Sequence, residues 1–183
     1  MIFQEKQIIL KNGKIAILKS PAIEDARQML NYISTACGET DFLARYPEEW
    51  ENMSVEKEEA WIKESLNASN ALIINCLVDG KIAGNCEIRF RTGIKTSHRA
   101  TVAIAILKKY WNIGIGSAMF EELIQAAREH GGVDLVELGF VEGNDRARHL
   151  YEKFGFKIVS ETPNAFKLKD GTRLKEFYMQ KEL

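Results

Sequence analysis

Two glycines punctuate the segment Trp111-Asn112-Ile113-Gly114-Ile115-Gly116-Ser117. The segment joins an apolar, strand-like stretch (residues 101–107) to a long amphipathic stretch with helical spacing. The first N–H groups of a helix have no acceptor within the helix, and together with the helix dipole they favour an anion. Because Gly114 and Gly116 carry no Cβ, the main chain there can come close to a ligand. The segment therefore predicts a phosphate-binding turn.

These glycines do not match two common nucleotide-binding loops. A P-loop needs GxxxxGK followed by Ser or Thr, and no such sequence is present. A dinucleotide fingerprint needs GxGxxG, but Met119 occupies the position of its third glycine, after several predicted strands. Nucleoside triphosphate hydrolysis and dinucleotide binding are therefore disfavoured.

Alternating apolar residues and turn dipeptides predict nine strands around this turn. They are residues 8–10, 14–18, 71–78, 81–90, 101–107, 134–141, 157–159, 165–168 and 175–180. Helical spacing and capping residues predict four helices. These are residues 23–33, a segment beginning at Ser54, 116–130 and 144–153. The order of these elements predicts an α+β sheet in which residues 101–107 and 134–141 are parallel neighbours, with ligands gathered at their carboxyl ends.

Composition favours one small, neutral domain. The chain has 183 residues, of which 45% are apolar, so we expect a single domain over residues 1–183. A net charge of −1 provides no field that would attract nucleic acid or an anionic membrane. We therefore expect a small-molecule or peptide partner.

Cysteine and histidine usage predicts neither a disulfide framework nor a metal site. Three cysteines show no CxxC spacing, and three histidines form no HxxxH pair. No run of ~18 apolar residues is present, and residues 1–10 lack a signal-peptide cleavage site. The expected compartment is the cytoplasm.

A second motif follows about thirty residues after the glycine turn. It reads Asn144-Asp145-Arg146-Ala147-Arg148-His149-Leu150-Tyr151-Glu152-Lys153-Phe154-Gly155-Phe156. Together the two motifs resemble the GNAT superfamily of acetyl-CoA-dependent N-acetyltransferases. That family has a Q/R-x-x-G-x-G/A loop, followed by Asn, Ala and Leu-Tyr before Gly-Phe. Trp111 departs from the pattern, because it stands where the family usually has Gln or Arg.

The resemblance implies a three-layer α/β/α fold with a mixed, mostly antiparallel sheet that is splayed at two central parallel strands. It also implies that one strand end holds the pantetheine arm of acetyl-CoA, that the glycine turn holds the pyrophosphate, and that the second motif lies beside the arm and the sulfur. The residues expected to bind the coenzyme are Ala105, Ile106, Leu107, Asn112, Ile113, Gly114, Ile115, Gly116, Ser117, Asn144, Arg146, Ala147 and Tyr151.

The implied reaction is direct attack of a primary amine on the thioester, without a metal. Tyr151 would be the general acid, because a phenol is protonated at neutral pH and can give its proton to the leaving thiolate. The frequent family carboxylate is missing before the turn, so Glu87 is the candidate base, with His98 as a substitute. A solvated or ion-paired Glu87 is an equally good interpretation.

Several alternatives stay open at this point. A catalytically silent sensor or scaffold that binds acyl-CoA would explain the missing carboxylate, and ATP binding in place of CoA would favour a nucleotide-dependent transferase. Residues 34–53, with Phe42, Tyr46 and Trp50, are either a substrate loop or a cap on the core. By analogy, a homodimer would use residues 165–180.

Overall fold

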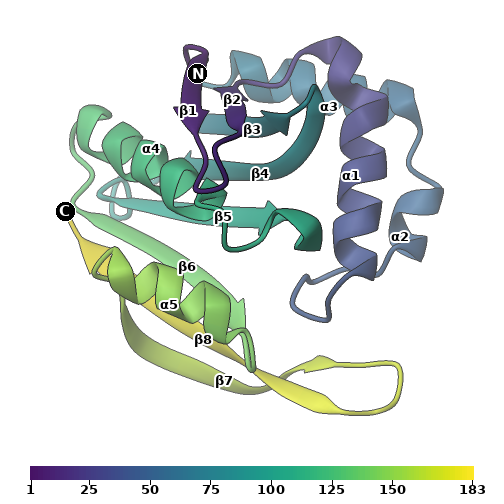
Figure 1. The fold of residues 1–183 in the computed structure, drawn as a ribbon. Helices are drawn as coiled ribbons and strands as arrows, with labels where there is room; N and C mark the ends of the chain where they lie inside the picture. The colour runs from purple at the N-terminus through teal and green to yellow at the C-terminus, as the bar shows by residue number, and fades with distance from the viewer.

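The computed structural model describes residues 1–183 and contains one eight-stranded mixed sheet (Figure 1). The strands are β1 (Lys6–Ile9), β2 (Ile15–Lys19), β3 (Ala71–Val78), β4 (Lys81–Phe90), β5 (Arg99–Ile106), β6 (Leu135–Val141), β7 (Lys157–Lys167) and β8 (Arg173–Glu182). The helices are α1 (Ala26–Gly38), α2 (Glu48–Glu51), α3 (Val55–Asn67), α4 (Ile115–Glu129) and α5 (Asp145–Lys153). The strand order in the sheet is β1-β2-β3-β4-β5-β6-β8-β7.

The centre of the sheet is its only parallel pair, β5 beside β6. These strands pair at three positions, from Arg99 opposite Leu135 to Thr101 opposite Glu137. Beyond Thr101 they diverge, as Figure 1 shows. The predicted mixed sheet with a splay between its central parallel strands is therefore confirmed.

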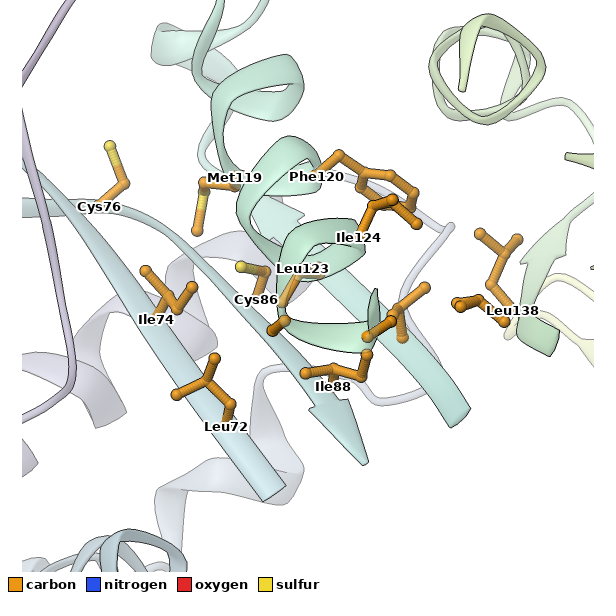
Figure 2. Packing of buried hydrophobic residues seen from close by; sticks show 14 of the residues in the cluster. Leu72, Ile74, Cys76, Cys86, Ile88, Met119, Phe120, Leu123, Ile124 and Leu138 are labelled. Atoms are coloured by element: carbon orange, nitrogen blue, oxygen red, sulfur yellow. The ribbon is translucent and has the colours of Figure 1, made fainter. Parts of the chain in front are cut away.

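Helices cover both faces of the sheet, which confirms the predicted three layers. Helix α4 buries Met119, Phe120 and Leu123 against Ile74 and other inward residues of the strands (Figure 2). Helices α1 and α3 form the opposite layer and pack on β3 and β4. In Figure 1 no helix of that second layer lies over β6, β8 and β7, so this part of the face is open.

Capping explains where two of the predicted helices begin. The side chain of Ser54 accepts a hydrogen bond from the Lys57 N–H at 3.3 Å, which caps α3. The side chain of Asn144 does the same for the Ala147 N–H at 3.3 Å and caps α5. Both boundaries agree with the sequence-based expectation.

Two predicted boundaries were wrong. Helix α1 runs on to Gly38, because Ala36 and Cys37 continue its buried face, and the short helix α2 lies within the predicted loop at 34–53. The two strands predicted at 157–159 and 165–168 form one strand, β7, which ends at Lys167. Register shifts interrupt its pairing with β8, which explains the broken sequence pattern. No helix is long and apolar enough to cross a membrane.

Candidate active site

The glycine turn begins α4, as its sequence predicted. Gly114 has φ 102°, a left-handed conformation that side chains with a Cβ rarely adopt, and it directly precedes Ile115, the first residue of the helix. Its carbonyl accepts the Ala118 N–H at 3.1 Å. The β1–β2 hairpin also contacts the turn, because the Lys11 N–H donates a hydrogen bond to the Ile113 carbonyl at 3.0 Å.

A cavity of about 550 Å³ opens beside this turn, between β5 and α5. Ten of the thirteen residues expected to bind the coenzyme line it. They are Ala105, Ile106, Asn112, Gly114, Gly116, Ser117, Asn144, Arg146, Ala147 and Tyr151. Three expected residues do not line it, namely Leu107, Ile113 and Ile115. Ile115 is buried in the core, Ile113 packs against it, and Leu107 is buried in the smaller cluster beneath α1 and α3.

At the end of β5, the backbone N–H and C=O groups of alternate residues point toward β4 or toward the opening between β5 and β6. The Ala105 carbonyl accepts the Tyr32 hydroxyl at 2.7 Å, and the Leu107 N–H donates to the Ala83 carbonyl at 2.9 Å. Both groups are therefore satisfied on the β4 side. Because successive residues of a strand direct their backbone groups to opposite sides, Ile104 and Ile106 present theirs to the opening between β5 and β6.

Trp111, which departs from the expected motif, has a structural role at this strand end. Its indole N–H donates to the Ile106 carbonyl at 2.7 Å. The Arg146 guanidinium lies over the indole ring, with Cζ 3.1 Å from the ring centroid, a cation–π contact that fixes the arginine beside the cavity. Burial lowers the pKa of Arg146, and nearby Tyr151 opposes this shift.

Tyr151 reaches the cavity from a buried position on α5. It is 6% exposed and packs on the rings of Phe120 and Phe140, with centroids 5.2 and 6.0 Å away. Burial raises the pKa of Tyr151 to about 12, although the charge on Arg146 acts in the opposite direction. The phenol therefore keeps its proton at neutral and mildly alkaline pH.

The structure adds two cations that sequence reasoning missed. Lys11, from the β1–β2 hairpin, and Lys153, at the end of α5, both line the cavity. Lys153 Nζ lies 3.1 Å from Ser117 Oγ, and neither lysine forms an ion pair within the chain. Lys11 is 103 positions before Gly114, and nothing in the sequence connects a hairpin residue to the distant turn.

The two candidate bases do not line this cavity. Glu87 Oε1 and Oε2 accept from Arg89 Nε and Nη2, each at 3.1 Å, so both carboxylate oxygens are engaged by a cation. His98 is exposed in the loop between β4 and β5. Arg148, the second arginine of the Asn144 motif, pairs with Glu152 at 2.8 Å on the exposed side of α5.

The segment after α1 contributes one of its three aromatic residues to the cavity. Phe42 lines the cavity, whereas Tyr46 and Trp50 do not. The Tyr46 hydroxyl accepts the Lys169 N–H at 3.1 Å, and Lys169 Nζ lies 2.5 Å from Glu48 Oε1, so this segment is tied to the β7–β8 turn. No group of three or more His, Cys, Asp or Glu side chains is arranged to hold a metal ion.

Comparison with known proteins agrees with this geometry. The family model described as "Acetyltransferase (GNAT) family" matches residues 38–156. The L-amino acid N-acetyltransferase AaaT of Escherichia coli K12 is 29% identical over 102 residues, which cover 56% of this chain and 62% of AaaT. An N-alpha-acetyltransferase of Sulfurisphaera tokodaii is 31% identical over 106 residues, covering 52% of this chain and 62% of that protein. The chain thus spans less than two thirds of these relatives.

Solved structures share the fold over nearly the whole chain. A GNAT-family acetyltransferase from Streptococcus pneumoniae superimposes with a TM-score of 0.85 at 26% identity, covering 92% of this chain and 99% of that one. The yncA protein of Salmonella typhimurium, solved with its cofactor acetyl-CoA, gives a TM-score of 0.77 at 16% identity, covering 92% and 94% of the two chains.

Proposed function

This chain belongs to the acetyltransferase (GNAT) family, and on that premise we propose that it transfers an acetyl group from acetyl-CoA to a primary amine. The observation that carries the proposal is the cavity itself. It brings together the glycine turn, the parted edge of β5 and the buried phenol of Tyr151. Similarity to named N-acetyltransferases supports the same reaction class.

The residues around the cavity fit acetyl-CoA. A Cβ at Gly116 would meet Leu150 Cδ2 at 3.2 Å and Ile106 Cδ1 at 3.4 Å, so the turn lies closely against the cavity wall. The backbone N–H groups at the start of α4 suit a pyrophosphate, and Lys11 and Lys153 add positive charge. The edge of β5 would pair with the pantetheine arm as an added strand does, through Ile104 and the Ile106 N–H, since the Ile106 carbonyl already accepts the Trp111 indole N–H.

The proposed chemistry is direct attack of a neutral amine on the thioester. Holding amine and thioester together can supply roughly 7–11 kcal/mol of the barrier. Tyr151 would donate its proton to the departing sulfur, which is worth about 10²- to 10⁴-fold in rate. The raised pKa of Tyr151 supports this role, because the proton is present at working pH.

A catalytically silent sensor that binds acyl-CoA is the second candidate. One observation favours it: the predicted base, Glu87, is held by Arg89 and does not line the cavity. The two candidates share the same coenzyme site, so coenzyme binding alone does not separate them. Measured turnover with an amine separates them, because only the enzyme would release CoA.

The proposal is tested in two steps. First, calorimetry measures the binding of acetyl-CoA and CoA to the wild type and to Gly114→Glu, whose side chain would occupy the turn. We expect micromolar binding to the wild type and its loss in the variant. Second, thiol release is measured with L-amino acids, spermidine and a peptide with a free N-terminus. Binding without turnover would favour the sensor, and no binding would contradict both candidates.

We also infer a single domain over residues 1–183, which the one continuous sheet supports. A homodimer through the C-terminal strands is supported by β7, an exposed strand at the edge of the sheet, and sedimentation would test it. A cytoplasmic location is supported by three free cysteines, as expected for a reducing compartment.

A further inference from the structure

On the face of the sheet opposite α4 and α5, three carboxylates lie away from the strand ends, whereas a fourth, Glu182, closes β8 opposite Leu135, before the point where β5 and β6 part. The three are Glu87 on β4, Glu137 on β6 and Glu176 on β8. Glu87 is held by Arg89, and Glu137 accepts hydrogen bonds from both Arg91 and Arg99. Glu176 forms no ion pair and accepts only the neutral hydroxyl of Tyr178, at 2.6 Å. It is therefore the carboxylate of the three that is free to receive a cation.

The carboxylate of Glu176 lies over a residue that has no side chain. A Cβ built on Gly139 would be 2.7 Å from Glu176 Oε1, so any larger residue there would displace the carboxylate. Tyr178 holds the other oxygen, Oε2. The Gly139 position and the Tyr178 hydroxyl thus fix where Glu176 points, and Oε1 is left for another partner.

Gly139 lies where β5 and β6 begin to part. It is two residues beyond Glu137, the last residue of β6 that pairs with β5, and the matching position on β5 is Ala103. Both positions are exposed, and Gly139 has no side chain while Ala103 has only a methyl group, so the sheet is open at this point. A second cavity of about 270 Å³ hollows the same face; Glu176 does not line it, but the two residues that position its carboxylate, Gly139 and Tyr178, do.

We propose that the acceptor amine approaches through this face and that Glu176 takes its proton. The inference rests on the proposed acetyltransferase function. Tyr151 reaches the splay from the α5 side, whereas Glu176 faces it from the opposite side of the sheet. A thioester held between the parted strands would therefore meet an acid on one side and a base on the other.

The proton balance follows from this arrangement. An alkylammonium with a pKa of ~10 gives one proton to Glu176, which releases it to solvent. The neutral nitrogen then forms a bond to the thioester carbon, and the carbon–sulfur bond breaks. Tyr151 gives its proton to the sulfur, and the second proton lost by the nitrogen restores the phenol. The products are an amide, a free thiol and one proton in solution.

The surroundings of Glu176 leave it available for this step. Thr162 lies opposite it on β7, and Tyr178 is its neighbour on β8. The charge of Glu137, further along β6, is compensated by Arg91 and Arg99. No lysine or arginine competes for Glu176.

The test compares Glu176→Gln with the wild type on the most reactive member of the amine panel. We expect kcat/KM to fall about 10²- to 10⁴-fold at neutral pH, with acetyl-CoA affinity unchanged. The deficit should narrow as pH rises, because solution then supplies neutral amine. The matched control is Glu161→Gln, which removes an exposed carboxylate of β7 paired with Lys175 and should leave kcat/KM within about twofold.

A second variant addresses the position of the carboxylate rather than its charge. Gly139→Ala keeps the Glu176 carboxylate but forces it to move away from the new methyl group. We therefore expect kcat/KM to fall about tenfold or more while coenzyme binding persists. If the wild type is active and Glu176→Gln has the same kcat/KM at every pH, the inference is overturned and the acetyltransferase proposal still stands. A wild type that binds acetyl-CoA but acetylates no amine would overturn both.

Discussion

Tyr151 owes its chemical character to its position on α5. Three aromatic rings pack around it, it is 6% exposed, and it lines the cavity. Burial disfavours the phenolate, so the pKa rises to about 12. A raised pKa keeps the proton in place below that value, and the phenol therefore cannot limit the rate by ionising in the neutral range.

Tyr151→Phe is the corresponding prediction. The substitution removes only the hydroxyl and keeps the ring packing, so we expect kcat to fall about 10²- to 10⁴-fold with little change in acetyl-CoA affinity. Steady-state kinetics and calorimetry on the same preparation provide the check. Because the pKa of Tyr151 is raised to about 12, the wild type should show no loss of activity from this group up to about pH 11. Unchanged kcat in the variant would remove Tyr151 from the reaction.

Lys11 places a positive charge beside the glycine turn. Its side chain lines the cavity without an acidic partner, so its charge is available to a phosphate. Lys11→Ala should weaken acetyl-CoA binding about fivefold at low salt, corresponding to roughly 1 kcal/mol, and less at high salt. Titration calorimetry at two salt concentrations measures this.

Lys14→Ala is the matched control for that experiment. Lys14 belongs to the same hairpin but pairs with Asp79 at 2.7 Å and does not line the cavity. Its removal should leave coenzyme affinity unchanged at both salt concentrations. Equal weakening by the two variants would mean that the hairpin, rather than the Lys11 charge, supports the turn.

Between elements, the hydroxyl of Tyr32 joins α1 to the two strands that end at the cavity. It accepts the Asn85 N–H of β4 at 3.1 Å and donates to the Ala105 carbonyl of β5 at 2.7 Å. One buried hydroxyl therefore stands where a direct strand-to-strand bond would otherwise form. The position of the β5 end depends on it.

Removal of this bridge should cost stability. Tyr32→Phe leaves a buried N–H and a buried carbonyl without this partner, and we expect unfolding free energy to fall by about 1–3 kcal/mol. Urea denaturation measures the loss. Tyr46→Phe, which removes an acceptor at an exposed site, should change stability by less than about 0.5 kcal/mol. If Tyr32→Phe is equally harmless, the two strands must re-pair directly.

The sequence predicted elements best where local chemistry sets their ends. Asn144 and Ser54 cap their helices, and the Asp79-Gly80 turn joins β3 to β4 as expected. Prediction failed where tertiary packing decides. The burial of Cys37 extends α1, and β7 continues through register shifts because β8 supports it as a partner strand. Ala36 and Cys37 do keep the helical spacing of α1, but the polar residues around them hide it, whereas the shifted pairing of β7 leaves no alternation in the local sequence.

At the level of the whole molecule, the site joins residues from distant parts of the chain. The glycine turn and the Asn144 motif lie close enough in sequence to be linked by their spacing alone. Lys11, near the start of the chain, lines the cavity only because the order of strands brings its hairpin beside the glycine turn, and the proposed base Glu176, near the other end of the chain, reaches Gly139 in the same way. Their types are ordinary surface residues, and only the fold distinguishes them.

At the centre of the sheet, β5 and β6 pair at only three positions, and the ion pairs of Glu137 add to them. It lies at the last of three positions where β5 meets β6, and Arg91 and Arg99 bind it from the other half of the sheet. Burial alone would raise the pKa of Glu137, but the hydrogen bonds and charges of Arg99 and Arg91 outweigh burial and lower it. A lowered pKa means that the carboxylate stabilises the fold above its unfolded value of ~4.3 and loses this effect as pH falls.

Glu137→Gln should therefore reduce unfolding free energy at pH 7 by about 1–3 kcal/mol, because two arginines would then face each other without a counter-charge. The difference from the wild type should shrink as pH falls from the unfolded value of ~4.3 through the lowered pKa of folded Glu137, where the carboxylate becomes protonated. Urea denaturation across that pH range measures both effects. Glu161→Gln, which breaks only the exposed pair with Lys175, should cost less than about 1 kcal/mol. A constant difference between Glu137→Gln and the wild type at all pH values would show that packing, rather than charge, joins the two halves of the sheet.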